Sequence, residues 1–318
     1  MSTSGKTGAG TAVPTPRTAL RTELRKGFAY GFGAYLIWGS FPLFISMLAF
    51  APVSEVVGWR ILFGFVTASV LITVSRGWKQ IWAILRDRRL MGWLALASVL
   101  ILVNWEVYVL GVLTQQVVQS SLGYFINPLV TIVLAVVFLG ERLGRVQWVA
   151  VALGLIAVTI LTVDYGQPPW IALSLALSFG FYGLVKSKLS GQLSALNSYA
   201  VETLLVIPVA IAQMAVFAGP TGIAFGREFW PSVGLAFFGV MTAVPLIMFG
   251  SAAKRLPLSY VGFMQYLTPS IQFFVAIALL HEPMPPVRWV GFAVVWSGLL
   301  LLVIDAGRRV RKSQSFTA

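Results

Sequence analysis

The chain has 318 residues, of which 58% are hydrophobic and only 10% are charged. A soluble domain is roughly 45 to 50% apolar, so this composition excludes an ordinary soluble protein and indicates a membrane protein. The chain has no cysteine, which excludes disulfide and thiol chemistry. The first 26 residues are polar and rich in Ser, Thr, Gly and Pro, without the apolar centre of a signal peptide. We expect residues 1–26 to form a disordered, basic cytoplasmic arm.

Ten apolar runs follow, each long enough to cross a bilayer as a helix of about 20 residues. In chain order they occupy residues 28–50, 54–76, 92–113, 116–138, 145–163, 169–187, 195–217, 229–250, 257–280 and 286–306. The sequence therefore predicts an all-α, polytopic membrane protein with ten transmembrane helices. The last residues, 307–318, form a basic tail that we expect to be cytoplasmic.

The 23 Lys and Arg residues are distributed unevenly between the two ends of these helices. If the N terminus is cytoplasmic, 20 of them lie in cytoplasmic segments, Arg227 and Arg288 lie outside, and Arg60 lies within a span. This asymmetry follows the positive-inside rule and predicts that both termini are cytoplasmic. Because the basic residues are spread over six segments, the formal charge of +13 reports topology, and no nucleic-acid partner is expected.

A sequence repeat relates the two halves of the chain. At a constant offset of 141 residues, four residues match identical partners: Pro128 with Pro269, Glu141 with Glu282, Trp148 with Trp289, and Asp164 with Asp305. The halves, 27–164 and 165–306, each hold five predicted helices. Because five is odd, the second half crosses the membrane in the opposite orientation, as in the inverted repeats of secondary carriers. We expect Pro128 and Pro269 to kink one helix in each half, and Glu141 and Glu282 to be turn and interface residues.

Five short motifs are distinctive: NWEVYVLGV at 104–112, SLGYFINPL at 121–129, GERL at 140–143, ETL at 202–204 and QYLTPS at 265–270. Together they resemble the RarD branch of the drug/metabolite transporter superfamily, which is built from two EamA-like repeats. The resemblance covers roughly residues 24–307. It implies a permease of the cytoplasmic (inner) membrane, not an enzyme, and the family name associates it with chloramphenicol handling.

Ionisable residues inside the predicted helices are candidates for function, because a charge at the bilayer centre costs at least about 2.5 to 3.5 kcal/mol. Arg60 and Glu106 are expected at matching depths, so an ion pair between them is geometrically feasible. For both residues, a role in transport and a structural role as a buried pair stay open. Glu202 lies within reach of Lys186, which can instead extend to the cytoplasmic surface. We favour a functional role for Glu202, whereas Glu55 is expected near the outer surface.

Aromatic and amide side chains supply the other candidates for contact with substrate. Aromatic faces accept flat or cationic solutes, and amides can hydrogen-bond a polar ligand. These candidates are Trp38, Trp105, Tyr108, Tyr124, Phe125, Tyr182, Tyr266, Asn104, Asn127, Gln265 and Gln272. Packing within the bundle is the alternative for each of them.

The sequence thus predicts a secondary carrier for a small organic solute within a lipid bilayer, with no cofactor and no metal site. Proton exchange at Glu106 or Glu202 is a secondary interpretation, since burial raises the pKa of a carboxyl group. A passive channel or facilitator is the alternative, and a membrane scaffold that does not transport is the third. The direction of transport and the oligomeric state stay open.

Overall fold

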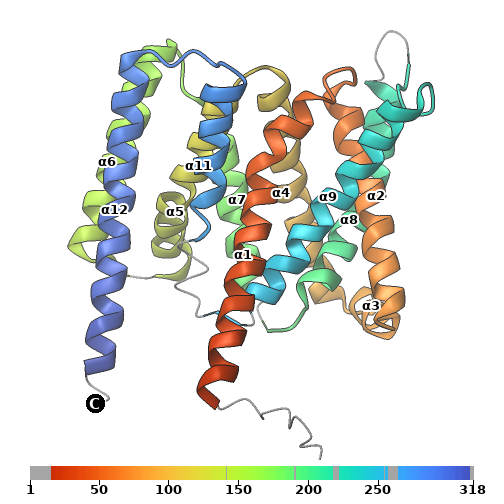
Figure 1. Ribbon diagram of the computed structural model, residues 1–318, viewed down its shortest axis with the longest axis horizontal. Helices are drawn as coiled ribbons and strands as arrows, with labels where there is room; N and C mark the ends of the chain where they lie inside the picture. The colour runs from red at the N-terminus through yellow and green to blue at the C-terminus, as the bar shows by residue number, and fades with distance from the viewer. Residues whose placement is uncertain are drawn as a thin grey trace, which may run out of the picture.

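The computed structural model describes residues 16–140, 142–189, 191–217, 222–253, 255–256 and 264–315. The described residues form a bundle of helices without a strand (Figure 1). Nine of the described helices are long and apolar enough to cross a membrane, and Leu267–Leu279 is a shorter apolar segment. These observations confirm the predicted all-α, polytopic fold class.

Helices from the first half of the chain are α1 (Pro16–Ser46), α2 (Val53–Val74), α3 (Trp78–Arg86), α4 (Arg88–Leu113), α5 (Val117–Leu139) and α6 (Arg145–Tyr165). Those from the second half are α7 (Trp170–Lys188), α8 (Ala195–Val216), α9 (Phe229–Ala253), α11 (Leu267–Phe274), the π-helical turn η1 (Val275–Leu279) and α12 (Pro286–Ser315). Residues 257–263, where the ninth predicted helix begins, lie outside the described residues.

The first helix begins earlier than predicted. Residues 16–26 are helical, so the expectation of a disordered arm is wrong for them, and residues 1–15 lie outside the described residues. Proline is favoured in the first helical turn, where its missing N–H is not needed, and α1 begins at Pro16. Within this extension Glu23 forms ion pairs of 2.9 Å with Lys26 and with Arg255. At the other terminus, α12 continues beyond the predicted end at residue 306.

A short amphipathic helix, α3, lies in the connection between the second and third predicted spans. Its Ile81 and Ile84 are buried, whereas Trp82 and Arg86 are exposed. The turn after α3 is stabilised by Asp87, whose Oδ1 accepts hydrogen bonds from the backbone N–H groups of Arg89 (2.9 Å) and Leu90 (3.1 Å), the second and third residues of α4. A helix of this length is too short to span a membrane.

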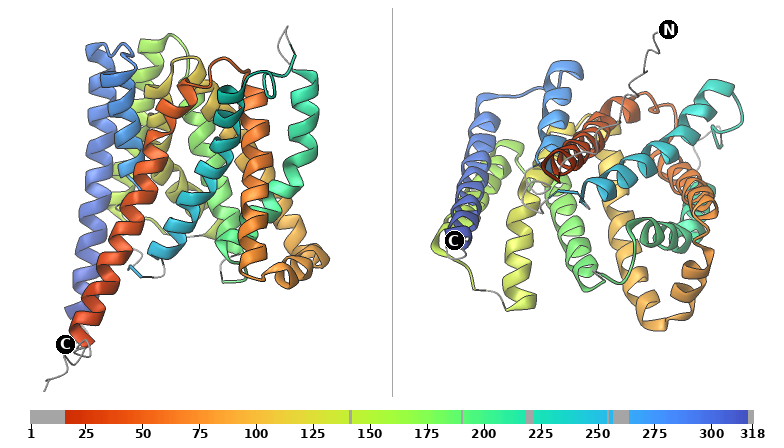
Figure 2. Two further views of the ribbon diagram at one scale, coloured as in Figure 1. Left: turned by 45° about the vertical axis from the view of Figure 1, so that its right-hand side comes forward. Right: turned by 60° about the horizontal axis from the view of Figure 1, so that its bottom comes forward.

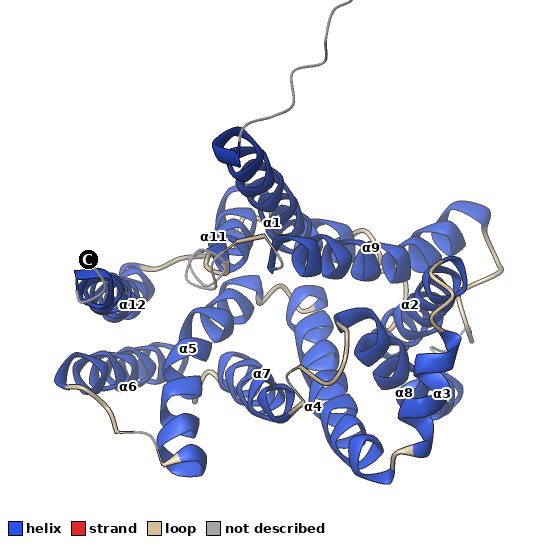
Figure 3. Ribbon diagram, turned by 90° about the horizontal axis from the view of Figure 1, so that it is seen from below, coloured by secondary structure: helices blue, strands red, loops and turns tan. Residues whose placement is uncertain are grey.

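The start of α1, the end of α12 and α3 lie at one end of the bundle, which we call the terminal end (Figures 1 and 2). The opposite end carries the connections at residues 47–52, 114–116 and 280–285. Seen along the bundle, α6 and α12 lie together at one edge, and α2, α3 and α8 lie at the other (Figure 3).

The main contacts between helices are preserved when corresponding helices of the two halves are exchanged. In chain order, α1 of the first half corresponds to α7 of the second, α2 to α8, α4 to α9, α5 to α11 and α6 to α12. When corresponding helices are exchanged, the pair α1–α9 becomes α7–α4, α5–α7 becomes α11–α1, and α2–α9 becomes α8–α4. All six pairs are in contact. The pairs α2–α8, α5–α11 and α6–α12 map onto themselves and are also in contact. This is the contact pattern that a two-fold relation between five-helix units generates.

The two prolines that were expected to kink helices lie in different settings. Pro128 lies inside α5. Pro269 lies in the first turn of α11, which continues as the π-helical turn η1. Sharp bends of helices occur at prolines and at π-bulges. The kinks themselves stay a prediction.

Candidate functional site

Arg60 of α2 is buried in the middle of the bundle, with only 4% of its surface exposed. Its guanidinium carbon Cζ lies 4.4 Å from the ring centroid of Trp105, 5.0 Å from that of Phe238 and 5.7 Å from that of Phe41. Within the part of the chain that the structure describes, its Nε and Nη1 have no hydrogen-bond partner. Cation–π contacts therefore surround the charge, and its polar edge is left free.

The feasible ion pair between Arg60 and Glu106 is not formed. Glu106 Oε1 instead accepts a hydrogen bond of 2.7 Å from Gln213 Nε2 on α8. Consecutive residues of an α-helix point about 100° apart. On α4, Trp105 consequently faces Arg60, and Glu106 faces α8.

A hydrogen-bonded group lies beside Arg60. Asn104 Nδ2 of α4 donates to the carbonyl oxygen of Leu175 (3.2 Å) and to Ser178 Oγ (3.1 Å), both on α7. Its Oδ1 accepts from the Tyr124 hydroxyl of α5 at 3.1 Å. Asn104 thus joins three helices through one amide group.

This network continues toward α11. The rings of Tyr108 and Tyr124 meet edge to face, with centroids 5.8 Å apart, and the Tyr108 hydroxyl accepts a hydrogen bond of 2.9 Å from Gln272 Nε2. The Arg60 guanidinium lies close enough to the hydroxyl groups of Tyr108, Tyr124 and Tyr199 to interact with them electrostatically. The structure therefore brings several of the predicted residues into one buried site.

We call this site the central cluster, and its members are Arg60, Asn104, Trp105, Tyr108, Tyr124, Asn127, Tyr199 and Gln272. Besides Arg60, three of them have a buried polar atom without a partner among the described residues: Tyr199 Oη, Asn127 Oδ1 and Gln272 Oε1. Such atoms cost about 1 to 3 kcal/mol each, and folded proteins contain few. The central cluster thus leaves both donors and acceptors free.

Glu202 is fully engaged by three donors. Lys186 Nζ and Ser198 Oγ each lie 2.7 Å from its Oε1, and the Tyr182 hydroxyl donates to Oε2 at 3.0 Å. The Glu202 side chain is 3% exposed and that of Lys186 is 30% exposed. Lys186 therefore reaches inward to the carboxylate and does not extend away from it.

The other predicted residues lie around or outside the central cluster. Trp38 is half-buried against Phe249, and its carbonyl oxygen accepts from Gln272 at 3.4 Å. Gln265 is exposed and Tyr266 is half-buried, both ahead of α11, so they are not among the buried residues of the cluster. Phe125 packs against Phe292 and Trp296 of α12.

Sequence reasoning missed Tyr199 of the central cluster and two rings beside Arg60, those of Phe41 and Phe238. Tyr199 lies three residues before Glu202, within the polar run Asn197–Ser198–Tyr199 near the start of an apolar helix, and that run was the available signal. Phe41 and Phe238 gave no signal, because they are two of 22 phenylalanines.

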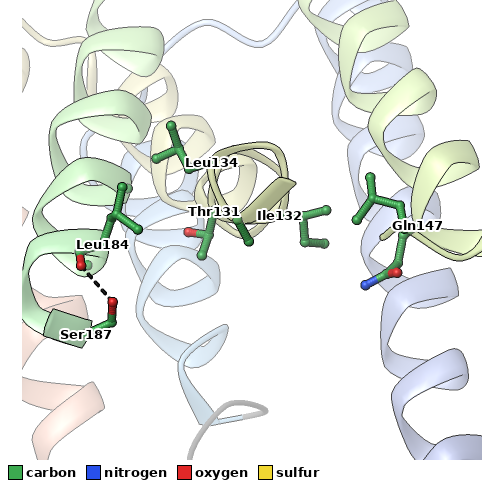
Figure 4. A pocket seen from close by; sticks show the side chains of 10 residues that line it. Thr131, Ile132, Leu134, Gln147, Leu184 and Ser187 are labelled. Atoms are coloured by element: carbon green, nitrogen blue, oxygen red, sulfur yellow. Dashed lines mark hydrogen bonds between the residues drawn. The ribbon is translucent and has the colours of Figure 1, made fainter. Parts of the chain in front are cut away.

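A cavity of about 310 Å³ lies between α5, α6 and α7 toward the terminal end (Figure 4). Thr131, Gly180, Ser187 and Gln147 are among the residues that line it. Asn127 Oδ1 lies beside Gly180, 3.6 Å from where a Cβ atom would stand on that glycine. Gly180, which lines this cavity, is thus a neighbour of Asn127 Oδ1, an unpartnered atom of the central cluster.

The opposite end is held together by carboxylates. Glu55 of α2 accepts from the backbone N–H groups of Ala224 (3.0 Å) and Phe225 (2.8 Å), before α9. Glu282 accepts from those of Val117 (2.6 Å) and Val118 (2.8 Å), at the start of α5. Each carboxylate therefore fastens two segments that are distant in the sequence.

Glu282 has the turn and interface role that the repeat suggested for it, whereas Glu141 lies outside the described residues. Burial raises the pKa of the Glu282 carboxyl group, and the two backbone N–H groups and Arg288 oppose that rise. Arg288 itself pairs with Asp164, with 2.7 Å between Nε and Oδ2, which joins the ends of α12 and α6.

The apolar helices, each long enough to span a bilayer, define a polytopic membrane protein, and buried polar residues within such helices are typical of transporters. Residues 25–163 match the EamA-like transporter family. The chain is 43% identical over 297 residues to protein RarD of Streptomyces exfoliatus, covering 92% of this chain and 93% of that protein. It is 38% identical over 299 residues to the uncharacterized transporter YojE of Bacillus subtilis, covering 92% and 98%. The chain therefore belongs to the RarD branch of the EamA-like transporters, in the drug/metabolite transporter superfamily.

One solved crystal structure resembles this fold with a TM-score of 0.60, covering 89% of this chain and 98% of the other. The two sequences are 14% identical, so this likeness concerns the fold alone. Because its relatives are named as transporters, the protein has a transport role and not an enzymatic one.

Proposed function

We propose that the protein is a secondary carrier that moves a small organic solute by alternating access, with the central cluster as the solute site. The observation that carries this proposal is that four of the five described residues with a buried, unpartnered polar side-chain atom lie in the central cluster: Arg60, Asn127, Tyr199 and Gln272, the fifth being Ser69. The four come from α2, α5, α8 and α11, two helices of each half. A binding site must leave polar groups free for its ligand, whereas a structural core pairs them.

In this proposal the halves 27–164 and 165–306 are inverted repeats. The repeat at an offset of 141 residues supports this relation, and so does the set of helix contacts that is preserved when the halves are exchanged. Inverted repeats allow one half to adopt the conformation of the other, which opens the site to each side in turn.

The terminal end is cytoplasmic in this proposal, because the basic residues gather there. The opposite end is tied by Glu55 and Glu282, and the cavity beside Gly180 lies toward the terminal end. The described state is then closed to the outside, and the solute reaches Asn127 from the cytoplasm through the cleft between α5 and α7.

Proton coupling is assigned to Glu106 and not to Glu202. Glu202 accepts from three donors, one of them the ammonium group of Lys186, and protonation would disrupt this set. Glu106 is half-buried, and Gln213 is the donor found for it among the described residues. A carboxylate with few partners in the membrane can take up a proton at lower cost.

Accumulation in liposomes tests the carrier. Purified protein is reconstituted, a pH gradient is imposed, and uptake is followed for chloramphenicol and for solutes selected by thermal stabilisation of the protein. A coupled carrier concentrates a solute above equilibrium, whereas a facilitator only equilibrates it. Equilibration without accumulation at every pH gradient would establish the passive alternative.

Two matched variants test the assignment of the proton. Glu106→Gln is expected to abolish accumulation driven by the pH gradient and to leave solute exchange measurable. Glu202→Gln keeps one of the two acceptor oxygens that Ser198 and Tyr182 use, and it is expected to retain pH-driven accumulation. The reverse outcome would assign the coupling to Glu202.

A further inference from the structure

We propose that the solute is an organic anion, whose carboxylate binds Arg60 and whose flat apolar body lies between aromatic rings. This inference rests on the proposed function, since it names the class of substrate for the same site. The argument begins with the charge of Arg60 and then considers its neighbours.

Arg60 carries a buried charge without a carboxylate partner among the described residues. Its Nε and Nη1 are buried and unpartnered, although a guanidinium can donate five hydrogen bonds. Leaving a buried charge unpaired is costly in the membrane interior, and such residues mark ligand or ion pathways. An anion that enters the site would remove this cost.

The aromatic neighbours of Arg60 do not use its N–H groups. Trp105 and Phe238 lie against the guanidinium, with centroids 4.4 and 5.0 Å from Cζ. A guanidinium can stack on aromatic faces while its N–H groups donate in its own plane to a carboxylate. Rings and carboxylate therefore bind different parts of the same side chain.

Tyr199 supplies a second donor at the same place. Its ring contacts Trp105, with centroids 6.4 Å apart, and its buried hydroxyl has no partner within the described ranges. The hydroxyl lies against Gly64, which is four residues, about one helical turn, from Arg60 on α2. A cationic centre beside a free hydroxyl is a set of donors that fits an anion.

The carboxylates that could neutralise Arg60 are engaged elsewhere. Glu106 bonds Gln213, Glu202 bonds Lys186, and Glu55 bonds the segment before α9. None of them forms an ion pair with Arg60, although the charge of Glu106 acts on the guanidinium at longer range. The positive charge of Arg60 also disfavours cationic solutes, which the aromatic residues taken alone would accept.

Three probes of nearly equal size and different charge test the inference on the whole protein in detergent: phenylacetate, phenylacetamide and phenethylamine. We expect phenylacetate to raise the thermal unfolding midpoint. The neutral amide should bind at least about tenfold more weakly in a tryptophan fluorescence titration, and the amine should not bind. Equal binding of the three probes would overturn the inference. So would equal stabilisation by inorganic phosphate at the same ionic strength, because the site would then recognise any anion.

Substitution of Arg60 provides a second test of the inference. Arg60→Gln is expected to weaken phenylacetate binding by about tenfold or more, and Arg60→Lys should retain part of the affinity because it keeps the charge. Arg89→Gln, which removes an exposed arginine in the first turn of α4, is the control and should bind as the wild type does. Unchanged binding in Arg60→Gln would overturn the inference. The comparison of probes on the wild type stands even if a variant fails to fold.

These experiments can refute the anion site and the carrier independently of each other. Phenylacetate that binds through Arg60 but is never moved across liposomes would refute the carrier and leave the anion site in place. Uptake of the amine or the amide by the reconstituted protein, without binding of phenylacetate, would refute the anion site and leave the carrier in place.

Discussion

At the scale of single residues, α4 shows how one helix serves three neighbours. Asn104 bonds α7, Trp105 lies against Arg60 of α2, and Glu106 bonds Gln213 of α8. Successive residues turn by about 100°, so three consecutive side chains reach three different helices. The motif at 104–112 is therefore a junction between helices as well as a part of the central cluster.

Replacing Asn104 tests this junction. Asn104→Leu removes the donor to Leu175 and Ser178 and leaves the Tyr124 hydroxyl without its acceptor. We expect a loss of about 1 to 3 kcal/mol in unfolding free energy, seen as a lower thermal midpoint. Thr159→Val, which alters an exposed hydroxyl bonded to its own helix, should change the midpoint little. Equal midpoints for the two variants would contradict the role of Asn104.

At the scale of elements, close approach of helices fixes the bundle. A Cβ atom on Gly239 of α9 would lie 2.5 Å from the backbone nitrogen of Gly64 on α2. Small residues allow such contacts between membrane helices. The pair α2–α9 and its exchange partner α4–α8 border Arg60 and Glu106, so this spacing positions the central cluster.

Substitutions at two glycines of α9 separate packing from helix propensity. Gly239→Ala is expected to destabilise the protein by about 1 to 3 kcal/mol, because backbone must move to admit the methyl group. Gly250→Ala meets nothing within 4 Å and should be neutral or slightly stabilising. Thermal midpoints of the two variants in the same detergent compare them. A tolerated alanine at 239 would show that α2 and α9 can separate without cost.

The turn before α12 is a second element with a definable task. Glu282 satisfies two of the free N–H groups in the first turn of α5. Glu282→Gln replaces one acceptor by a donor, so we expect it to loosen the opposite end. Because the chain has no cysteine, a cysteine placed at buried Ser121 can report this opening through its rate of labelling.

Labelling of Ser121→Cys should be faster in the Glu282→Gln background than in the parent. Glu228→Gln, at an exposed residue of the same end, serves as the matched control and should leave the rate unchanged. An unaltered rate in Glu282→Gln would mean that its contacts with Val117 and Val118 do not hold that end closed.

At the scale of the whole molecule, the two ends differ in charge and in closure. The basic residues gather at the terminal end with α3, and the carboxylate contacts of Glu55 and Glu282 lie at the other end. A carrier needs such a difference at any moment, since only one side of its site is open at a time.

Membrane topology follows from this arrangement and can be measured in cells. Single cysteines at Arg89 and at Arg227 are expected to react with a membrane-impermeant reagent from the cytoplasmic side and from the outer side, respectively. The bundle places these residues at opposite ends, and the positive-inside rule assigns the sides. Labelling of both cysteines from one side would refute the ten-helix arrangement.

The composition of the sequence and the spacing of its apolar runs were sufficient to predict much of the fold. Apolar runs of about 20 residues gave the positions of the spans, because a bilayer imposes its thickness on each helix. They did not give α3, whose nine residues are too few for a span. They also did not give the start of α1 at Pro16, because helical extensions into water are polar and resemble loops in composition.

For the site, the sequence indicated which residues are costly in a membrane, and tertiary structure decided what they contact. Arg60, Glu106 and Glu202 stood out because charge is rare in apolar helices. Their partners depended on the rotation of each helix, which follows from packing. Packing brought Lys186 to Glu202, turned Glu106 toward Gln213, and placed Arg60 among Trp105, Phe41 and Phe238, where its Nε and Nη1 have no partner among the described residues.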